Sequence, residues 1–252
     1  MRNESRMSGS GRGGEKPIAE MRRGAYRLLL HLVRSTAGPI GPLLDRIRGV
    51  LEPWLGPAAF DQSQVAPKLR FRVDAEEGAA PLRLKIEIAT REIEAFDPPR
   101  AMPFAVDNPW FTGEADIATY SREELLATKL RALLQRDKGR DLVDLSHALA
   151  VFPDLDKTRV VECFGLYLKR AGQSIGRAEA EKRMFAKLAR PSLVADIRPL
   201  LRAEEAERLS EERIRQSFLA VFRGLVAIMP GAPWAKTPER LGRLGVARNE
   251  GT

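Results

Sequence analysis

Two short stretches in the first half of the chain alternate strictly between apolar and polar side chains. The apolar positions are Leu69, Phe71 and Val73 in one stretch and Leu82, Leu84, Ile86 and Ile88 in the other. Because successive side chains of a strand point to opposite faces, each stretch predicts a strand with one buried and one solvated face. The Glu-Glu-Gly sequence at residues 76–78 suits a hairpin between them. The pattern therefore predicts an antiparallel pair of strands.

Helical spacing governs much of the remaining chain. Apolar residues recur at intervals of three and four over residues 40–55, where Pro53 and Gly56-Pro57 are expected to stop the helix. Ser121 and Glu124 form a capping box, which predicts a helix that ends near residues 138–139. Further helices are expected over residues 141–151, 155–171, 177–189, 191–203 and 210–229. Shorter strands are expected over residues 102–106 and 116–120, and residues 26–33 suit a strand or a helix.

The order of these elements predicts an α+β fold, with a mixed front half and an all-helical back half. Residues 1–16 are rich in Gly, Ser and Arg and predict a disordered tail. The character of the rest changes after residue 120. The expected division is therefore a mixed region over residues 17–120 and a helical region over residues 121–252.

Composition narrows the class of protein and of partner. The net charge of +8 over 252 residues favours a polyanionic partner such as RNA, DNA or a nucleotide. The single cysteine, Cys163, excludes an intramolecular disulfide and a cysteine-rich zinc site, and its helical apolar surroundings predict a buried core thiol. The longest apolar run, residues 218–229, is broken by Arg223 and is too short to cross a bilayer. We therefore expect a cytoplasmic protein without a membrane partner.

Glu87 is the first candidate for chemistry. It belongs to the solvated face of its predicted strand, together with Arg83 and Lys85 and with Arg70 and Arg72 of the neighbouring strand. A carboxylate among cations can bind a divalent metal beside a phosphate, or it can neutralise its neighbours. The strand pattern leaves both roles open.

Lys129 and an acidic pair follow in the helical half. Lys129 lies at the edge of an apolar stripe, from where it can project its ammonium group as a phosphate ligand or merely keep it in water. Asp141 and Asp144 are three residues apart and share a helix face beside Arg140. Asp141 also suits the N-terminus of a helix, where a carboxylate stabilises the helix dipole.

Three motifs in this order resemble the AbiEii family of nucleotidyltransferase toxins. They read Leu-Lys-Ile-Glu-Ile-Ala-Thr-Arg-Glu at residues 84–92, Thr-Tyr-Ser-Arg-Glu-Glu-Leu-Leu-Ala-Thr-Lys-Leu-Arg-Ala-Leu at residues 119–133, and Gln-Arg-Asp-Lys-Gly-Arg-Asp-Leu-Val-Asp-Leu at residues 135–145. The resemblance also takes in Ala-Gly-Pro-Ile-Gly-Pro-Leu-Leu-Asp from residue 37. It covers residues 31–150 strongly.

The resemblance implies a DNA polymerase β-like nucleotidyltransferase core with a mixed sheet, part of which is expected over residues 17–120. It implies transfer of a nucleoside monophosphate from an NTP to an acceptor, with RNA such as tRNA expected, together with Mg²⁺ and a cognate antitoxin. Such proteins belong to type IV toxin–antitoxin systems, which act in abortive infection. By resemblance, Glu87 is the third metal-binding carboxylate, Lys129 contacts the nucleotide phosphates and Asp141 belongs to the fourth motif. The expected substrate-binding residues beside them are Arg140, Asp144 and Lys85.

The chain departs from the family pattern before residue 33. The family's first motif has a Gly-Gly turn, a serine and an Asp-x-Asp pair, and here Arg27 stands at the serine and Leu29 and His31 stand at the two aspartates. Leucine offers no ligand atom and imidazole is a poor ligand for Mg²⁺. Gly13-Gly14 is either a remnant of the turn or part of the tail, and the chain resembles an N-terminally truncated or degenerate copy.

Two alternatives remain for His31 and for the function. His31 can join Glu87 in a transition-metal site or can lie in a rearranged segment without a ligand, whereas His147 falls on the outer part of a helix and is no candidate. The chain as a whole is either a weakened nucleotidyltransferase or a non-catalytic protein that binds nucleic acid or an antitoxin. Loss of residues that act as a unit lowers catalysis by about 10³-fold or more, which is why both readings stay open.

Overall fold

The computed structural model describes residues 27–33, 39–63, 66–74, 81–89, 94–107, 112–136, 138–190, 193, 197–198, 203–207 and 209–245. The chain divides into two compact units, Met1–Ile93 and Glu94–Thr252. The predicted α+β class is confirmed by the element order. The expected tail and the Glu-Glu-Gly connection lie outside the described residues, and the functional division at residue 120 stays a prediction.

The first unit is built on a mixed four-stranded sheet in the order β1-β4-β3-β2. Its strands are β1 (Arg27–Val33), β2 (Ala59–Asp61), β3 (Lys68–Val73) and β4 (Leu82–Ala89). β3 and β4 are antiparallel, as the alternating pattern predicts, and β1 pairs parallel to β4. The ambiguous segment before residue 33 is therefore a strand, at the edge of the sheet beside β4.

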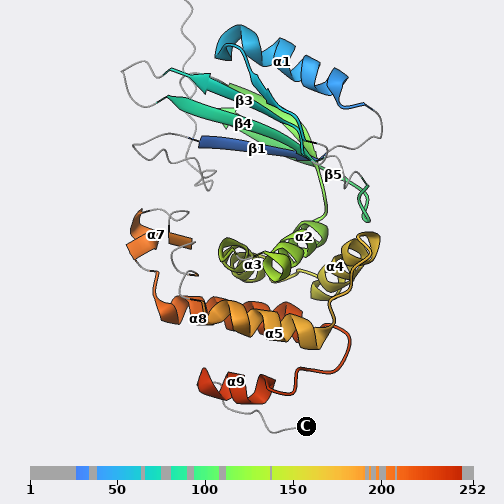
Figure 1. The fold of residues 1–252 in the computed structure, drawn as a ribbon, viewed down its shortest axis with the longest axis vertical. Coiled ribbons are helices and arrows are strands. Elements are labelled where there is room, and N and C mark those ends of the chain that lie inside the picture. Colours follow the sequence, from blue (N-terminus) through green and yellow to red (C-terminus); the bar gives the residue numbers. More distant parts are fainter. Residues whose placement is uncertain are drawn as a thin grey trace, which may run out of the picture. The chain divides into compact units, whose positions relative to one another are not determined.

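Helix α1 (Gly41–Leu55) covers one face of this sheet (Figure 1). Leu44 and Leu55 pack on the buried side chains of the two central strands, namely Leu69, Phe71, Ile86 and Ile88. Pro53 is accommodated inside the last turn, and the helix ends at Gly56, whose φ of 78° is favourable only for glycine. One face of the sheet is thus the core of the unit, and the polar side chains lie on the other.

The second unit begins with a hairpin and continues as helices. β5 (Arg100–Asp107) and β6 (Thr112–Thr119) form a separate antiparallel pair. The helices are α2 (Arg122–Gln135), α3 (Arg140–Val151), α4 (Lys157–Arg170), α5 (Arg177–Leu188), α7 (Ala203–Glu207), α8 (Glu211–Val221) and α9 (Thr237–Arg243). A π-helical turn, η2 (Phe222–Val226), extends α8. The predicted 210–229 helix therefore changes its winding part-way, and most of the predicted 191–203 helix lies outside the described residues.

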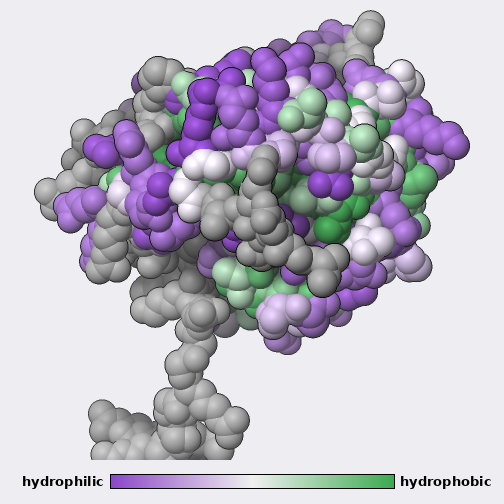
Figure 2. Space-filling model, turned by 90° about the horizontal axis from the view of Figure 1, so that it is seen from below, coloured by the Kyte–Doolittle hydropathy of each residue, from purple (hydrophilic) through white to green (hydrophobic). Residues whose placement is uncertain are grey.

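The core of the helical unit lies among α2, α3, α4, α5 and α8. Phe185 packs with Phe218 and Phe222 at ring-centroid distances of 5.3 and 5.4 Å. Cys163 is buried in the same core, as predicted, and burial raises the pKa of its thiol to about 11. Figure 1 shows α5 beside α8, and Figure 2 shows a mainly hydrophilic outer surface with limited hydrophobic areas. In the part of the chain that the structure describes, no helix has the length and apolar character needed to cross a membrane.

Helix α2 starts as predicted but ends earlier. Ser121 is its N-cap, and the Ser121 Oγ accepts a hydrogen bond of 3.1 Å from the Glu124 amide. The Glu124 side chain does not close the capping box, because it binds the amides of Phe96 and Asp97 instead. The helix ends at Gln135, before the expected residues 138–139, and Gly139 caps the next helix.

Candidate functional site

Lys85 and Glu87 lie on the face of β4 that α1 does not cover, since Ile86 and Ile88 point into the core. The Lys85 Nζ is 2.9 Å from the Glu87 Oε2, and the Glu87 side chain is 20% exposed. Glu87 therefore neutralises a neighbouring cation, which is one of the two roles open to it from the sequence. Its role as a metal ligand stays a prediction.

The neighbouring strands extend this polar face. In the strand register, Lys68 of β3 lies opposite Glu87 of β4, and Asp61 of β2 lies opposite Lys68. Asp61 in turn accepts a hydrogen bond of 2.6 Å from Arg70 Nη2. Asp61 and Glu87 are therefore each in contact with a cation.

β1 is the neighbour of β4 on the side opposite β3. Leu29 is paired with Lys85, and His31 is paired with Glu87. The two positions that correspond by resemblance to the missing aspartates are thus direct strand neighbours of Lys85 and Glu87. Aspartates at positions 29 and 31 would therefore lie beside Glu87 in this register and would give a group of three carboxylates.

Lys129 is brought together with Asp141 and Asp144 in the helical unit. The Lys129 Nζ, on α2, is 2.5 Å from the Asp144 Oδ2 and 3.8 Å from the Asp141 Oδ1, both on α3. The side chains differ sharply in exposure, at 43% for Lys129, 47% for Asp144 and 3% for Asp141. The ammonium group therefore bridges one exposed and one buried carboxylate at an open edge of the helix pair.

Asp141 is an unusual member of this cluster because its burial is incompletely compensated. Its Oδ2 is buried without a hydrogen-bond partner among the described residues. Burial raises the pKa of the Asp141 carboxyl, and the positive charges of Lys129, Arg136 and Arg140 oppose that shift. Asp141 lies in the first turn of α3, as expected, but the N-cap is Gly139 and has no side-chain cap bond.

The α2–α3 connection that precedes Asp141 is held by residues of α5. Lys187 is buried and donates hydrogen bonds to the carbonyl oxygens of Arg136 and Lys138. Arg183 donates to the carbonyl oxygen of Leu134, in the last turn of α2. A helix leaves its last carbonyls without intrahelical partners, and α5 supplies donors for them. The sequence offers no signal for this role, because both cations lie on an ordinary amphipathic helix.

Gly139 allows close packing at the same connection. A Cβ at this position would lie 2.7 Å from the Leu193 Cδ1 and 3.0 Å from the Ile197 Cγ1. A larger residue would displace one of these neighbours. The start of α3, and with it Asp141, is therefore fixed both by α5 and by this contact.

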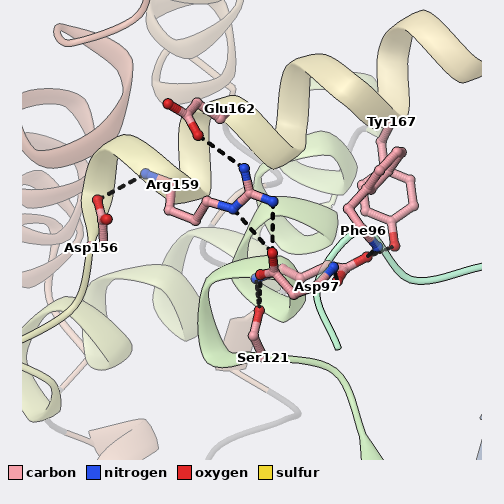
Figure 3. A network of polar contacts seen from close by, with 8 residues as sticks. Phe96, Asp97, Ser121, Asp156, Arg159, Glu162 and Tyr167 are labelled. Atoms are coloured by element: carbon pink, nitrogen blue, oxygen red, sulfur yellow. Dashed lines mark hydrogen bonds and ion pairs between the residues drawn. The ribbon is translucent and has the colours of Figure 1, made fainter. Parts of the chain in front are cut away.

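A second polar network anchors the beginning of the helical unit (Figure 3). Asp97 accepts hydrogen bonds from Ser121 Oγ at 2.6 Å and from Arg159 Nη2 at 2.6 Å. The Ser121 bond and the Arg159 pair hold the pKa of Asp97 below its usual range, against the effect of burial. Glu124, fully buried, also accepts from the Tyr167 hydroxyl at 2.7 Å. The network ties residues 96–97 to α2 and α4 and has a structural role.

The family relationship is decided by a match that spans most of the chain. A family model described as "Nucleotidyl transferase AbiEii toxin, Type IV TA system" matches residues 28–223. The chain belongs to this family. The resemblance carried by the three sequence motifs is confirmed, and membership of a type IV system implies a cognate antitoxin.

Two solved structures from Helicobacter pylori are similar to the chain. One, described as a candidate nucleotidyltransferase, is 16% identical with a TM-score of 0.44, and the match covers 80% of this chain and 78% of that one. The other, JHP933, is 14% identical with a TM-score of 0.42, and the match covers 88% of this chain and 82% of that one. Comparison with curated proteins gives no match.

The residues present do not fit the Mg²⁺ site that the family implies. Within the described ranges, no three His, Cys, Asp or Glu side chains are grouped closely enough to hold a metal ion. Glu87 is ion-paired to Lys85, and the register positions beside it hold Leu29 and His31. Mg²⁺ requires several oxygen ligands in near-octahedral geometry, and this set supplies a single carboxylate.

Proposed function

We propose that this family member binds the phosphates of a nucleoside triphosphate and of an RNA acceptor, tRNA first among them, and transfers nucleoside monophosphate at a strongly reduced rate. We place this activity in the cytoplasm, in a toxin–antitoxin system that acts in abortive infection. The effect of the protein there would depend mainly on its binding of RNA and nucleotide. Family membership supports the substrate class. The net charge of +8 supports a polyanionic partner.

The arrangement of charges on the polar face of the sheet supports the low rate of nucleotidyl transfer. Asp61, Lys68 and Glu87 occupy consecutive register positions on three neighbouring strands, so a cation separates the two carboxylates of the polar face. Strands are about 4.8 Å apart, which places the two carboxylate positions roughly 10 Å from each other. Lys68 stands between the two positions, Asp61 is ion-paired with Arg70, and Glu87 is ion-paired with Lys85, so each carboxylate already has a cationic partner in place of a metal ion. Nucleotidyl transfer relies on carboxylates that hold metal ions at the reacting phosphate.

Two cations, Lys129 and Arg140, support the binding of phosphates in the helical unit. Lys129 presents a half-exposed ammonium group beside Asp144 and Asp141. An incoming phosphate can replace the exposed Asp144 as its partner, because a surface ion pair contributes only about 0–1 kcal/mol. Arg140, exposed at the start of α3, adds a second cation at this edge.

The experiment combines transfer and binding on the same protein. Each labelled NTP is incubated with total tRNA and Mg²⁺, and tRNA binding is measured over a series of salt concentrations. We expect tRNA binding that weakens with salt, and label transfer so slow that it does not measurably exceed that of the Asp141→Ala control. Absence of tRNA binding would overturn the proposal.

A second candidate function, efficient nucleotidyl transfer, is favoured by one observation. The buried Asp141 Oδ2 has no hydrogen-bond partner among the described residues, and the Oδ1 of the same carboxyl lies 3.8 Å from the Lys129 Nζ, which is an incompletely paired acid of the kind often found at active sites. In the same experiment, transfer by the native chain that is lost in the Asp141→Ala variant would establish this function in place of the first.

A further inference from the structure

The basic residues of the β3–β4 face fall into two groups. Arg70 and Lys85, which are directly paired across the strands, each contact a carboxylate: Asp61 at 2.6 Å and Glu87 at 2.9 Å. Arg72 and Arg83 are paired at the next position of the same face and are both exposed. Neither forms an ion pair or hydrogen bond with another residue that the structure describes, and neither does Asp74 nearby.

The pairing of Arg72 with Arg83 is unfavourable for the sheet itself. Side chains directly opposite each other on antiparallel strands have Cβ atoms about 5 Å apart, and like charges at that distance repel. β1 places Arg27 at the adjacent register position beside Arg83, so three neighbouring strands carry an arginine in one row. We call Arg27, Arg72 and Arg83 the arginine row. An anion bound across this row would relieve the repulsion.

We propose that the arginine row is a binding site for the sugar–phosphate backbone of the RNA acceptor. Guanidinium groups bind phosphates in a planar, bidentate manner, and they remain charged at every physiological pH. The site is unassigned by the family relationship and rests on the proposed function, because an RNA partner is part of that function.

The position of the row favours RNA over the triphosphate of a nucleotide. Arg83 precedes Glu87 by four residues on β4, which corresponds to about 13 Å along a strand. A nucleotide whose reacting phosphate lies at Glu87 would leave the arginine row to a second polyanion. A row across three strands spans about 10 Å, which is enough for successive phosphates of one RNA strand.

The ion pairs provide a matched control for the experiment. Arg72→Gln, Arg83→Gln and Arg70→Gln each remove one positive charge from the same face, but only Arg70 is already paired with a carboxylate. Binding of total tRNA is measured by filter retention over a series of KCl concentrations. We expect Arg72→Gln and Arg83→Gln each to weaken binding about three- to tenfold and to reduce the slope of log K against log[KCl] by about 1. Arg70→Gln should change binding less than twofold.

A further variant, Asp61→Asn, should change tRNA binding in the opposite direction. Asp61→Asn releases Arg70, so it should strengthen tRNA binding and increase the salt slope. Equal losses in all three glutamine variants would overturn the arginine row while leaving the proposed function in place. Absence of tRNA binding by the native chain would overturn both. As a control for folding, each variant should have the circular dichroism spectrum and the melting temperature of the native chain.

Discussion

At the scale of single residues, Asp141 combines burial, an unpartnered oxygen and a raised pKa. A carboxyl whose pKa is higher in the folded than in the unfolded chain binds protons more tightly when folded. Its contribution to stability is therefore lost as pH rises from the unfolded value, about 3.9, through the folded value. A buried acid of this kind lowers stability at neutral pH, and perturbed acids of this kind are common at functional sites.

The Asp141→Asn variant tests this sign. The amide cannot ionise, so the unfolding free energy of the variant minus that of the native chain should grow as pH rises from about 3.5 to 7. Urea unfolding followed by circular dichroism at several pH values measures the difference. Asp144→Asn is the control: it removes the exposed carboxylate of the same cluster and should change stability by less than about 0.5 kcal/mol. A difference for Asp141→Asn that shrinks with rising pH contradicts the assignment.

At the scale of elements, Ser121 joins the start of α2 to the segment before the β5–β6 hairpin. It caps α2 through the Glu124 amide and also donates a hydrogen bond to Asp97. Ser210 caps α8 in the same way, because its Oγ accepts a hydrogen bond of 3.2 Å from the Arg213 amide, and its hydroxyl forms no second hydrogen bond with the residues that the structure describes. The two serines therefore separate the effect of a cap from that of the network in Figure 3.

The alanine variants of these serines should differ in stability. Loss of an N-cap costs about 1 kcal/mol, and a hydrogen bond to a charged group contributes about 1.5–3 kcal/mol. We expect Ser210→Ala to lower the unfolding free energy by about 1 kcal/mol and Ser121→Ala by about 2–3 kcal/mol. Denaturant unfolding of both variants gives the comparison. Equal losses would mean that the bond to Asp97 contributes nothing to stability.

The elements that the sequence predicts well are those fixed by local rules. The alternation around Phe71 and Ile86 predicts β3 and β4, and Ser121 predicts the start of α2. The same local rule predicts that the Glu124 side chain closes the capping box, but this side chain instead accepts hydrogen bonds from the amides of Phe96 and Asp97. Which of two partners a side chain takes depends on chain segments that are distant in sequence, and a local rule cannot include them.

At the scale of the whole molecule, the sequence predicts which residues form the candidate site, but it does not predict which side chains they contact. The sequence singles out Lys129, Asp141 and Asp144, and the packing of α2 on α3 brings them within hydrogen-bond or ion-pair distance. The support of this site by Lys187 was missed, because a buried lysine that binds backbone carbonyls looks like any lysine of an amphipathic helix. The pairing of His31 with Glu87 likewise depends on the register of a parallel strand pair, which the sequence pattern does not set.

In the proposed function, the residues at positions 29 and 31 limit nucleotidyl transfer. The most direct measurement is Mg²⁺-dependent transfer of labelled NTP to tRNA by the double variant Leu29→Asp/His31→Asp, with Leu29→Asn/His31→Asn as the uncharged control. Two carboxylates beside Glu87 would complete a metal-binding set, so we predict a rise in transfer of at least about 100-fold over the native chain and the control. Retained tRNA binding shows that the variants are folded. Native transfer as fast as that of the aspartate variant, or no rise in a variant that still binds tRNA, would contradict the account.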